Sequence, residues 1–111
     1  MTYHFLKIAP KWLRQIVSGG KTFEIRRTDR RFMIYDRLVL MEWQDCHYTG
    51  RYSIVKVMDV VTYEDFPDGL REGYCVLGIV RDPIGPEFMR DVFIPTAETQ
   101  GINTDLLEVQ L

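Results

Sequence analysis

The residues with the clearest potential for chemistry lie between Gly19 and Arg26, in the segment Gly-Gly-Lys-Thr-Phe-Glu-Ile-Arg. In a strand, alternate side chains share a face, which places Glu24 and Arg26 together, while Lys21 enters from the preceding turn. Same-face neighbours on a strand lie about 7 Å apart. This gap is too long for a direct contact between Glu24 and Arg26, so it predicts a small polar ligand held between the carboxylate and the guanidinium. The alternative is a structural ion pair on a half-exposed strand, which is common.

A short helix and a glycine turn are predicted to position this segment. Pro10 suits the first turn of a helix, where its missing N–H is harmless. One apolar stripe at helical spacing is expected to pack on the core, and it consists of Trp12, Leu13, Ile16 and Val17. Gly19 and Gly20 end the helix, one of them in the left-handed conformation. Lys21 is therefore held beside the end of the helix.

The apolar pattern elsewhere predicts strands. Phe23 and Ile25 are expected to face the core from a strand at 21–27. Further strands are predicted at 4–8, 36–43, 48–63 with a bend at Gly50, and 74–80. The order β-α-β-β-β-β predicts an α+β fold, namely a small open or closed barrel of five to six mostly antiparallel strands with one N-terminal helix.

The chain is predicted to divide near residue 82. Residues 1–82 are expected to form the barrel, and residues 83–111 a short helical or irregular segment followed by a weakly ordered tail. The helical spacing covers Phe88 to Phe93, whereas the chain from Pro95 onward shows no sustained period. The apolar residues of 106–111 remain available to dock on the barrel or on a partner.

Composition narrows the class of protein. A hydrophobic content of 46% in 111 residues is enough for one core. No apolar run is long enough to cross a bilayer, and no secretory leader is expected. Cys46 and Cys75 are expected to be free thiols in a reducing, cytoplasmic compartment. Cys46 and His47 have no second ligand pair, so we expect neither a metal nor a cofactor.

The charge is distributed unevenly. The net charge is −2, but residues 1–56 hold 11 basic and 5 acidic residues, whereas residues 57–111 hold 3 basic and 11 acidic ones. The basic half suggests a local anion-binding surface. An overall pI near 5.6 argues against strong, sequence-blind binding to nucleic acid.

The segment resembles a known family. Gly19, Lys21, Glu24 and Arg26 match the G-x-K-x-x-E-x-R signature of ASCH domains, which belong to the PUA-like superfamily. The resemblance runs from Tyr3 to Ile79 and is closest to a small stand-alone subfamily. Its other elements, in the same order and spacing, are His4-Phe5-Leu6-Lys7 with Pro10, Asp29-Arg30-x-Phe32, Asp36, Glu42-Trp43, Tyr48-Thr49-Gly50-Arg51 and Gly73-Tyr74.

Two positions depart from that subfamily. Thr28 stands where the subfamily usually has Asn before Asp-Arg, and Tyr35 stands where it usually has Gly. A glycine permits a turn with positive φ. Tyr35 is therefore expected to impose a different turn on residues 28–36.

The resemblance implies an RNA- or nucleotide-binding cleft between helix and barrel. The signature residues would line it, with three further residues as neighbours, so that the full predicted set is Lys7, Lys21, Glu24, Arg26, Arg30 and Trp43. Trp43 would stack on a base or belong to the core. Each cation also has a structural interpretation, because Lys21 can cap the helix and Arg30 can lie in a solvated turn. His4 is expected to be structural.

Two other functions stay open. Some stand-alone relatives hydrolyse the amide of acetylated cytidine with a Lys, a Thr and a Glu, which implies an amidohydrolase with Lys21 and Glu24 as catalytic residues. Glu24, however, occupies the position of that threonine, so the nucleophile is missing and Glu24 would act as a general base on water. The third possibility is a protein-interaction module that binds a partner through the acidic half and the tail.

Overall fold

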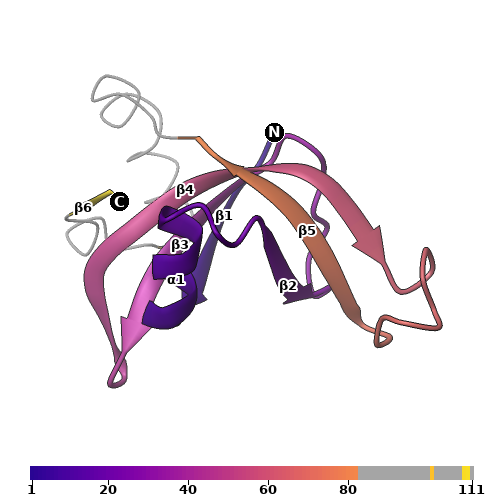
Figure 1. Cartoon of the computed structure of the whole chain (residues 1–111), viewed down its shortest axis with the longest axis horizontal. Coiled ribbons are helices and arrows are strands. Elements are labelled where there is room, and N and C mark those ends of the chain that lie inside the picture. The colour runs from indigo at the N-terminus through magenta and orange to yellow at the C-terminus, as the bar shows by residue number, and fades with distance from the viewer. Residues whose placement is uncertain (83–100, 102–108, 111) are drawn as a thin grey trace.

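In the part of the chain that the structure describes, the fold is a strongly curved sheet with one short helix in its hollow (Figure 1). The computed structural model describes residues 1–82, Gly101 and 109–110. The elements in chain order are β1 (Tyr3–Ile8), α1 (Pro10–Val17), β2 (Phe23–Arg27), β3 (Arg37–Gln44), β4 (His47–Thr62), β5 (Tyr74–Arg81) and β6 (Val109–Gln110). The prediction of a small, open, barrel-like α+β fold is confirmed.

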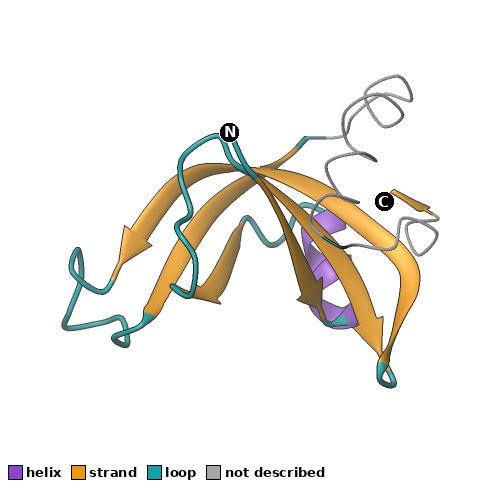
Figure 2. Ribbon diagram, turned by 180° about the vertical axis from the view of Figure 1, so that it is seen from behind, coloured by secondary structure: helices purple, strands orange, loops and turns teal. Residues whose placement is uncertain are grey.

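The sheet is an open half-barrel with β1 and β2 at its two edges. The strands follow the order β1-β3-β4-β5-β2, and β6 lies beside β4. β1 runs parallel to β3, and the β3–β4, β4–β5 and β5–β2 pairs are antiparallel. Seen from behind, the sheet arches over the space beneath it, with α1 on the concave side (Figure 2). No ladder joins the two edge strands within residues 1–82, and we call the opening between them the β1/β2 seam.

The helix begins and ends where local signals predict. Pro10 occupies its first turn, and Gly19 follows with a φ of +86°. The amide of Lys21 donates to the carbonyl of Gln15 (3.0 Å), which turns the chain sharply into β2. Leu13 and Ile16 are buried as expected, but Trp12 is 42% exposed. The predicted packing of Trp12 on the core is wrong because that flank of α1 faces the seam instead of the sheet.

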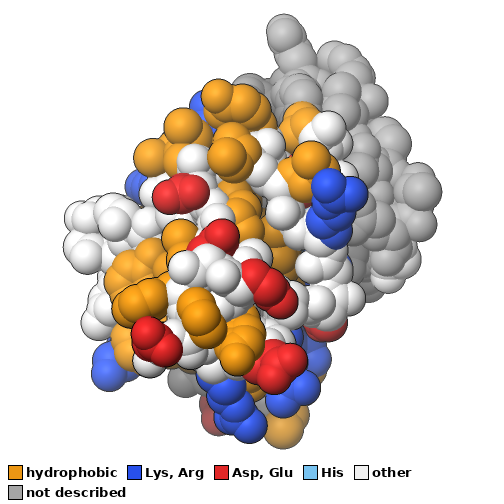
Figure 3. Space-filling view, turned by 90° about the vertical axis from the view of Figure 1, so that its right-hand side faces the viewer, with side chains coloured by type: hydrophobic (Ala, Val, Ile, Leu, Met, Phe, Trp, Pro, Cys, Tyr) orange, Lys and Arg blue, Asp and Glu red, His pale blue; other side chains and the backbone are white. Residues whose placement is uncertain are grey.

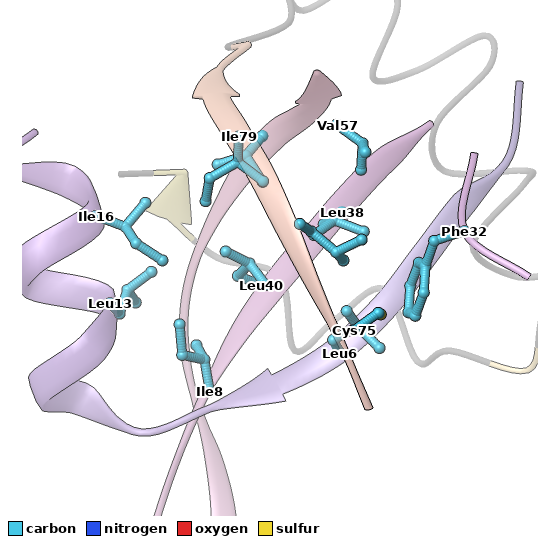
Figure 4. Packing of buried hydrophobic residues seen from close by; sticks show 12 residues of the cluster. Leu6, Ile8, Leu13, Ile16, Phe32, Leu38, Leu40, Val57, Cys75 and Ile79 are labelled. Atoms are coloured by element: carbon cyan, nitrogen blue, oxygen red, sulfur yellow. The ribbon is translucent and has the colours of Figure 1, made fainter. Parts of the chain in front are cut away.

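The core lies between α1 and the concave face of the sheet (Figure 4). The buried cluster comprises Leu6, Ile8, Leu13, Ile16, Phe32, Leu38, Leu40, Val55, Val57, Cys75, Leu77 and Ile79. β3 is buried on both faces, as predicted, and lies between β1 and β4 in the sheet. Phe32 anchors the turn after β2 in this core.

The two faces of β2 are reversed relative to the prediction. Phe23 and Ile25 are 43% and 57% exposed, whereas Glu24 is only 4% exposed. The alternation itself is present, but the polar face of this edge strand points into the half-barrel beside the seam. A charged residue thus takes the inward position that the sequence pattern assigns to apolar ones.

Turns at the ends of the strands follow backbone chemistry. Asp45 and Cys46 have φ values of +52° and +63° between the paired residues Gln44 and His47, as in a two-residue type I′ hairpin. Gly50, with a φ of +95°, lies in a register shift between β3 and β4, which confirms the predicted bend.

Tyr35 corrects another expectation. Its φ is +74°, so it adopts the left-handed conformation that a glycine would favour. The turn is held by the amide of Tyr35, which donates to the carbonyl of Val57 (2.7 Å), and by the amide of Asp36, which donates to the carbonyl of Met33 (3.0 Å). The turn therefore has the backbone conformation that suits glycine, and the backbone of Tyr35 is strained.

The β4–β5 loop carries acidic side chains. The exposed carboxylates are Glu64, Asp65, Asp68 and Glu72. On the face of the molecule shown in Figure 3, Asp and Glu side chains are spread among hydrophobic ones. β6 pairs with β4 through Val109 opposite Arg51 and Gln110 opposite Tyr52.

The predicted helical segment at Phe88–Phe93 lies outside the described residues, so the division at residue 82 stays a prediction. Within the described residues, no helix is long and apolar enough to span a membrane.

Candidate ligand-binding site

The carboxylate of Glu24 is clamped between two cations. Lys21 Nζ lies 2.5 Å from Oε1, while Arg26 Nε and Nη2 lie 2.9 Å and 2.7 Å from Oε2. The expected gap for a ligand between Glu24 and Arg26 is therefore absent. The long arginine side chain folds back along the strand and closes the distance that separates the two backbone positions.

We call Lys21, Glu24 and Arg26 the charged cluster. The side chain of Glu24 is almost fully buried, and a buried charge is tolerated only when it is paired. Two cations against one carboxylate leave the cluster with a net charge of +1. Lys21 also donates to the carbonyl of Phe23 (2.7 Å), and Arg26 Nη2 donates to the carbonyl of Lys7 (2.9 Å) across the β1/β2 seam. Within residues 1–82, Arg26 Nη1 has no protein acceptor.

A pocket of about 480 Å³ opens beside the charged cluster, between α1, β2 and the end of β1. The charged cluster and Lys7 supply its polar groups, and its apolar walls come from Ile8, Ala9, Trp12, Phe23 and Ile25. Lys21 Nζ lies 5.7 Å from the Trp12 ring centre and 4.8 Å from that of Phe23. This volume and this mixture of apolar walls with few polar groups are typical of small-ligand sites.

Trp43 lies outside this pocket. Its ring meets Tyr48 edge to face, with ring centres 4.8 Å apart, and Lys7 Nζ lies 3.8 Å from the Trp43 ring centre. Lys7 therefore covers one face of the Trp43 ring. A stacking role for Trp43 stays a prediction, and on this face it requires Lys7 to move aside.

Arg30 also lies outside the pocket, in a neighbouring hollow of about 190 Å³ that shares Arg26 with it. The structure thus gathers four of the predicted residues, Lys7, Lys21, Glu24 and Arg26, around one pocket. Sequence reasoning missed Trp12, Phe23 and Ile25 as pocket residues, because it assigned all three to the core. No local signal identifies Trp12, because its exposure depends on β2 being an edge strand, which only the order of the strands in the sheet shows.

His4 has the structural role expected of it. Its Nε2 lies 2.8 Å from Asp36 Oδ2, and its ring packs on Phe32 with centres 4.7 Å apart. Burial raises the pKa of the Asp36 carboxyl, but hydrogen bonds from His4 and from the amides of Thr2 and Met33 outweigh it, so the pKa is lowered overall. This buried pair anchors the turn of Tyr35 and lies apart from the pocket.

Glu42 is a second buried carboxylate, and its hydrogen-bond partners give it a structural role. Its Oε1 accepts from Arg51 Nε (2.9 Å), Arg51 Nη2 (2.6 Å) and Thr49 Oγ1 (2.8 Å). Burial raises the pKa of Glu42, whereas these hydrogen bonds and the charges of Arg51 and Arg14 lower it further than burial raises it. Within the described residues, no group of three or more His, Cys, Asp or Glu side chains is placed to hold a metal ion.

A family model and a curated relative match most and about half of this chain, respectively. The model of a family described as "Domain of unknown function (DUF3850)" matches residues 3–79. A curated relative, the "Uncharacterized 12.9 kDa protein in GpA 3′ region" of Escherichia phage P2, is 32% identical over 63 residues, which cover 57% of this chain. The matched part spans only 58% of the relative's length.

Two solved structures resemble this one. A mutant of ZmASCH from Zymomonas mobilis superposes with a TM-score of 0.50 at 16% identity, covering 80% of this chain and 79% of that one. The hypothetical protein PH0355 gives a TM-score of 0.49 at 14% identity, covering 74% of this chain and all of that one. At this identity the ZmASCH likeness concerns the fold alone, and it supports the predicted ASCH-like architecture.

Proposed function

The chain belongs to the DUF3850 family, and on the geometry of its pocket we propose that it is an ASCH-type module that binds RNA or a nucleotide. One observation carries the proposal: the charged cluster, which is partly buried and has a net positive charge, lines a pocket whose exposed walls include two aromatic rings. Nucleic-acid ligands present flat apolar faces, polar base edges and anionic phosphates. The pocket offers a complement to each of these three features.

Each pocket residue has a distinct role in this proposal. Trp12 and Phe23 offer exposed rings on which a base can stack. Lys21 and Arg26 donate to a base carbonyl or a phosphate through the N–H groups that Glu24 leaves unused. Glu24 sets the orientation of both cations, and its remaining lone pairs can accept from a base amino group.

The amidohydrolase is a second candidate because Lys21 Nζ and Glu24 Oε1 lie 2.5 Å apart beside the pocket. Lys21 would polarise the amide carbonyl, and Glu24 would take a proton from water. The geometry favours binding, since both oxygens of Glu24 already accept from cations.

NMR titration of the ¹⁵N-labelled protein tests both candidates. Nucleosides, nucleotides, short RNAs and N4-acetylcytidine are added in turn, and shifts are expected at the amides of residues 7–9, 12 and 21–26. Turnover of acetylcytidine, followed by chromatography, identifies a hydrolase. Glu24→Gln should abolish that turnover, whereas the exposed Glu72→Gln control should leave it unchanged. If no ligand shifts the pocket amides, both functions are wrong.

A further inference from the structure

A second hollow lies beside the pocket at the β1/β2 seam, and the linings of the two spaces share Arg26. This second hollow of about 190 Å³ is lined by Leu6, Arg26, Arg27, Asp29, Arg30 and Phe32. Arg26 lines both spaces and separates them, because its Nη2 reaches across the seam to the carbonyl of Lys7. A ligand that fills the pocket therefore has a second space directly beside it, on the far side of the Arg26 guanidinium.

The seam is much more positive than the rest of the protein. The residues that line the two spaces include five cations, Lys7, Lys21, Arg26, Arg27 and Arg30, and two carboxylates, Glu24 and Asp29. Their net charge is +3, although the whole chain carries −2. The negative charge of Glu24 is already paired with Lys21 and Arg26. The exposed Asp29 lies 3.7 Å from Arg30 Nε, which is a loose contact. Arg30 therefore keeps most of its capacity to bind an anion.

We propose that the seam binds a single-stranded oligonucleotide, with one base in the pocket and a phosphate of the adjoining nucleotide in the second hollow between Arg26 and Arg30. This inference rests on the proposed function and extends it from one nucleotide to a strand. The five residues of β2 span about 16 Å, which is longer than a single nucleoside. The path of the strand follows β2, from the end of α1 to the turn at residues 28–31.

An extended peptide that pairs with an open strand edge is the competing occupant of such a seam. Such pairing depends on free main-chain acceptors along the edge. Two of the acceptors at this seam are already used, since the carbonyl of Lys7 binds Arg26 and that of Phe23 binds Lys21. Together with the excess of cations, this favours a phosphate backbone over a peptide strand.

The test compares the four ribonucleosides with the four homotrinucleotides, by NMR titration at several salt concentrations. Trinucleotides should bind more tightly than the matching nucleosides, with a salt dependence that nucleosides lack. Arg30→Gln should reduce this gain about fivefold at low salt and lower the slope of log K against log salt by about 0.7, the value for one single-strand phosphate contact. Arg30→Lys should largely restore both.

Lys56→Gln is the matched control, because it removes one positive charge from β4 away from both spaces. Circular dichroism confirms that each variant is folded. If nucleosides bind but trinucleotides bind no tighter, or if Arg30→Gln and Lys56→Gln have equal effects, the strand proposal is wrong and the proposed function stands. A peptide-binding seam would give this same result. If neither ligand class binds, the proposed function itself fails and the strand proposal falls with it.

Discussion

Replacing Glu24 by Gln should destabilise the protein by about 2–3 kcal/mol. The substitution keeps the shape of the side chain but leaves Lys21 and Arg26 without their shared counter-charge. Removing one partner of a fully buried ion pair costs about 3–5 kcal/mol. The side chains of Lys21 and Arg26 are 11% and 21% exposed, so water compensates part of this loss. An amide also turns its NH₂ group toward one of the two cations.

Thermal and urea denaturation measure this effect. For a domain of this size, 2–3 kcal/mol corresponds to a fall in Tm of about 10–15 °C. Glu72→Gln is the matched control, because Glu72 is exposed in the β4–β5 loop and its replacement should change stability by less than about 0.5 kcal/mol. A loss at Glu24 no larger than that of the control would show that the charged cluster is a solvated surface pair.

A triple variant separates stability from function at the same site. Buried ion clusters can often be replaced by apolar residues of similar volume at no net loss of stability. Lys21→Met, Glu24→Leu and Arg26→Met together should therefore restore stability to within about 1 kcal/mol of the wild type, yet abolish ligand binding. If the triple variant is as unstable as Glu24→Gln, the charged cluster is a net stabiliser of the fold. Its presence would then be no argument for binding.

Three further predictions concern other parts of the molecule. Because the pKa of Asp36 is lowered in the folded state, its contribution to stability is fully present above about pH 4 and is lost at lower pH; the loss caused by Asp36→Asn in urea denaturation should therefore shrink as the pH falls from 7 to 2.5. Tyr35→Gly should raise the free energy of unfolding by up to about 1 kcal/mol, since it relieves a positive φ at an exposed residue; a lower Tm would show that the Tyr35 ring contributes more than its strain costs. Trp12→Ala should weaken nucleoside binding by about 1–3 kcal/mol in NMR titrations with little change in Tm, and unchanged affinity would remove Trp12 from the site.

Local signals predicted the element boundaries well. The helix from Pro10 to Val17 and the bend at Gly50 each depend on residues within a few positions of the feature. Proline in a first helical turn and glycine with positive φ have the same consequence in any fold. These predictions therefore needed no knowledge of which strands pair.

The orientation of β2 could not be obtained in the same way. Alternation shows that Glu24 and Arg26 share a face, but which face turns inward depends on the sheet order β1-β3-β4-β5-β2. The apolar Phe23 and Ile25 suggested the wrong choice, because hydrophobic residues usually take the inward side. The same assumption, that apolar residues face the core, left Trp12 of α1 out of the predicted site. The prediction for the turn at Tyr35 was wrong for a different reason. The hydrogen bonds from the amides of Tyr35 and Asp36 to the carbonyls of Val57 and Met33 impose a backbone conformation that tyrosine disfavours.

The open seam and the charged cluster explain each other. Within residues 1–82 no ladder joins the edge strands β1 and β2, and two main-chain carbonyls at the seam accept from side-chain donors. Arg26 supplies one across the seam and Lys21 supplies another on β2, and both cations then require the buried carboxylate of Glu24. An apolar β2 face would instead have closed the seam by simple packing. The chain keeps the seam open with fixed donors, beside a pocket walled by exposed aromatic rings, and this arrangement is better suited to receiving a ligand than to filling a core.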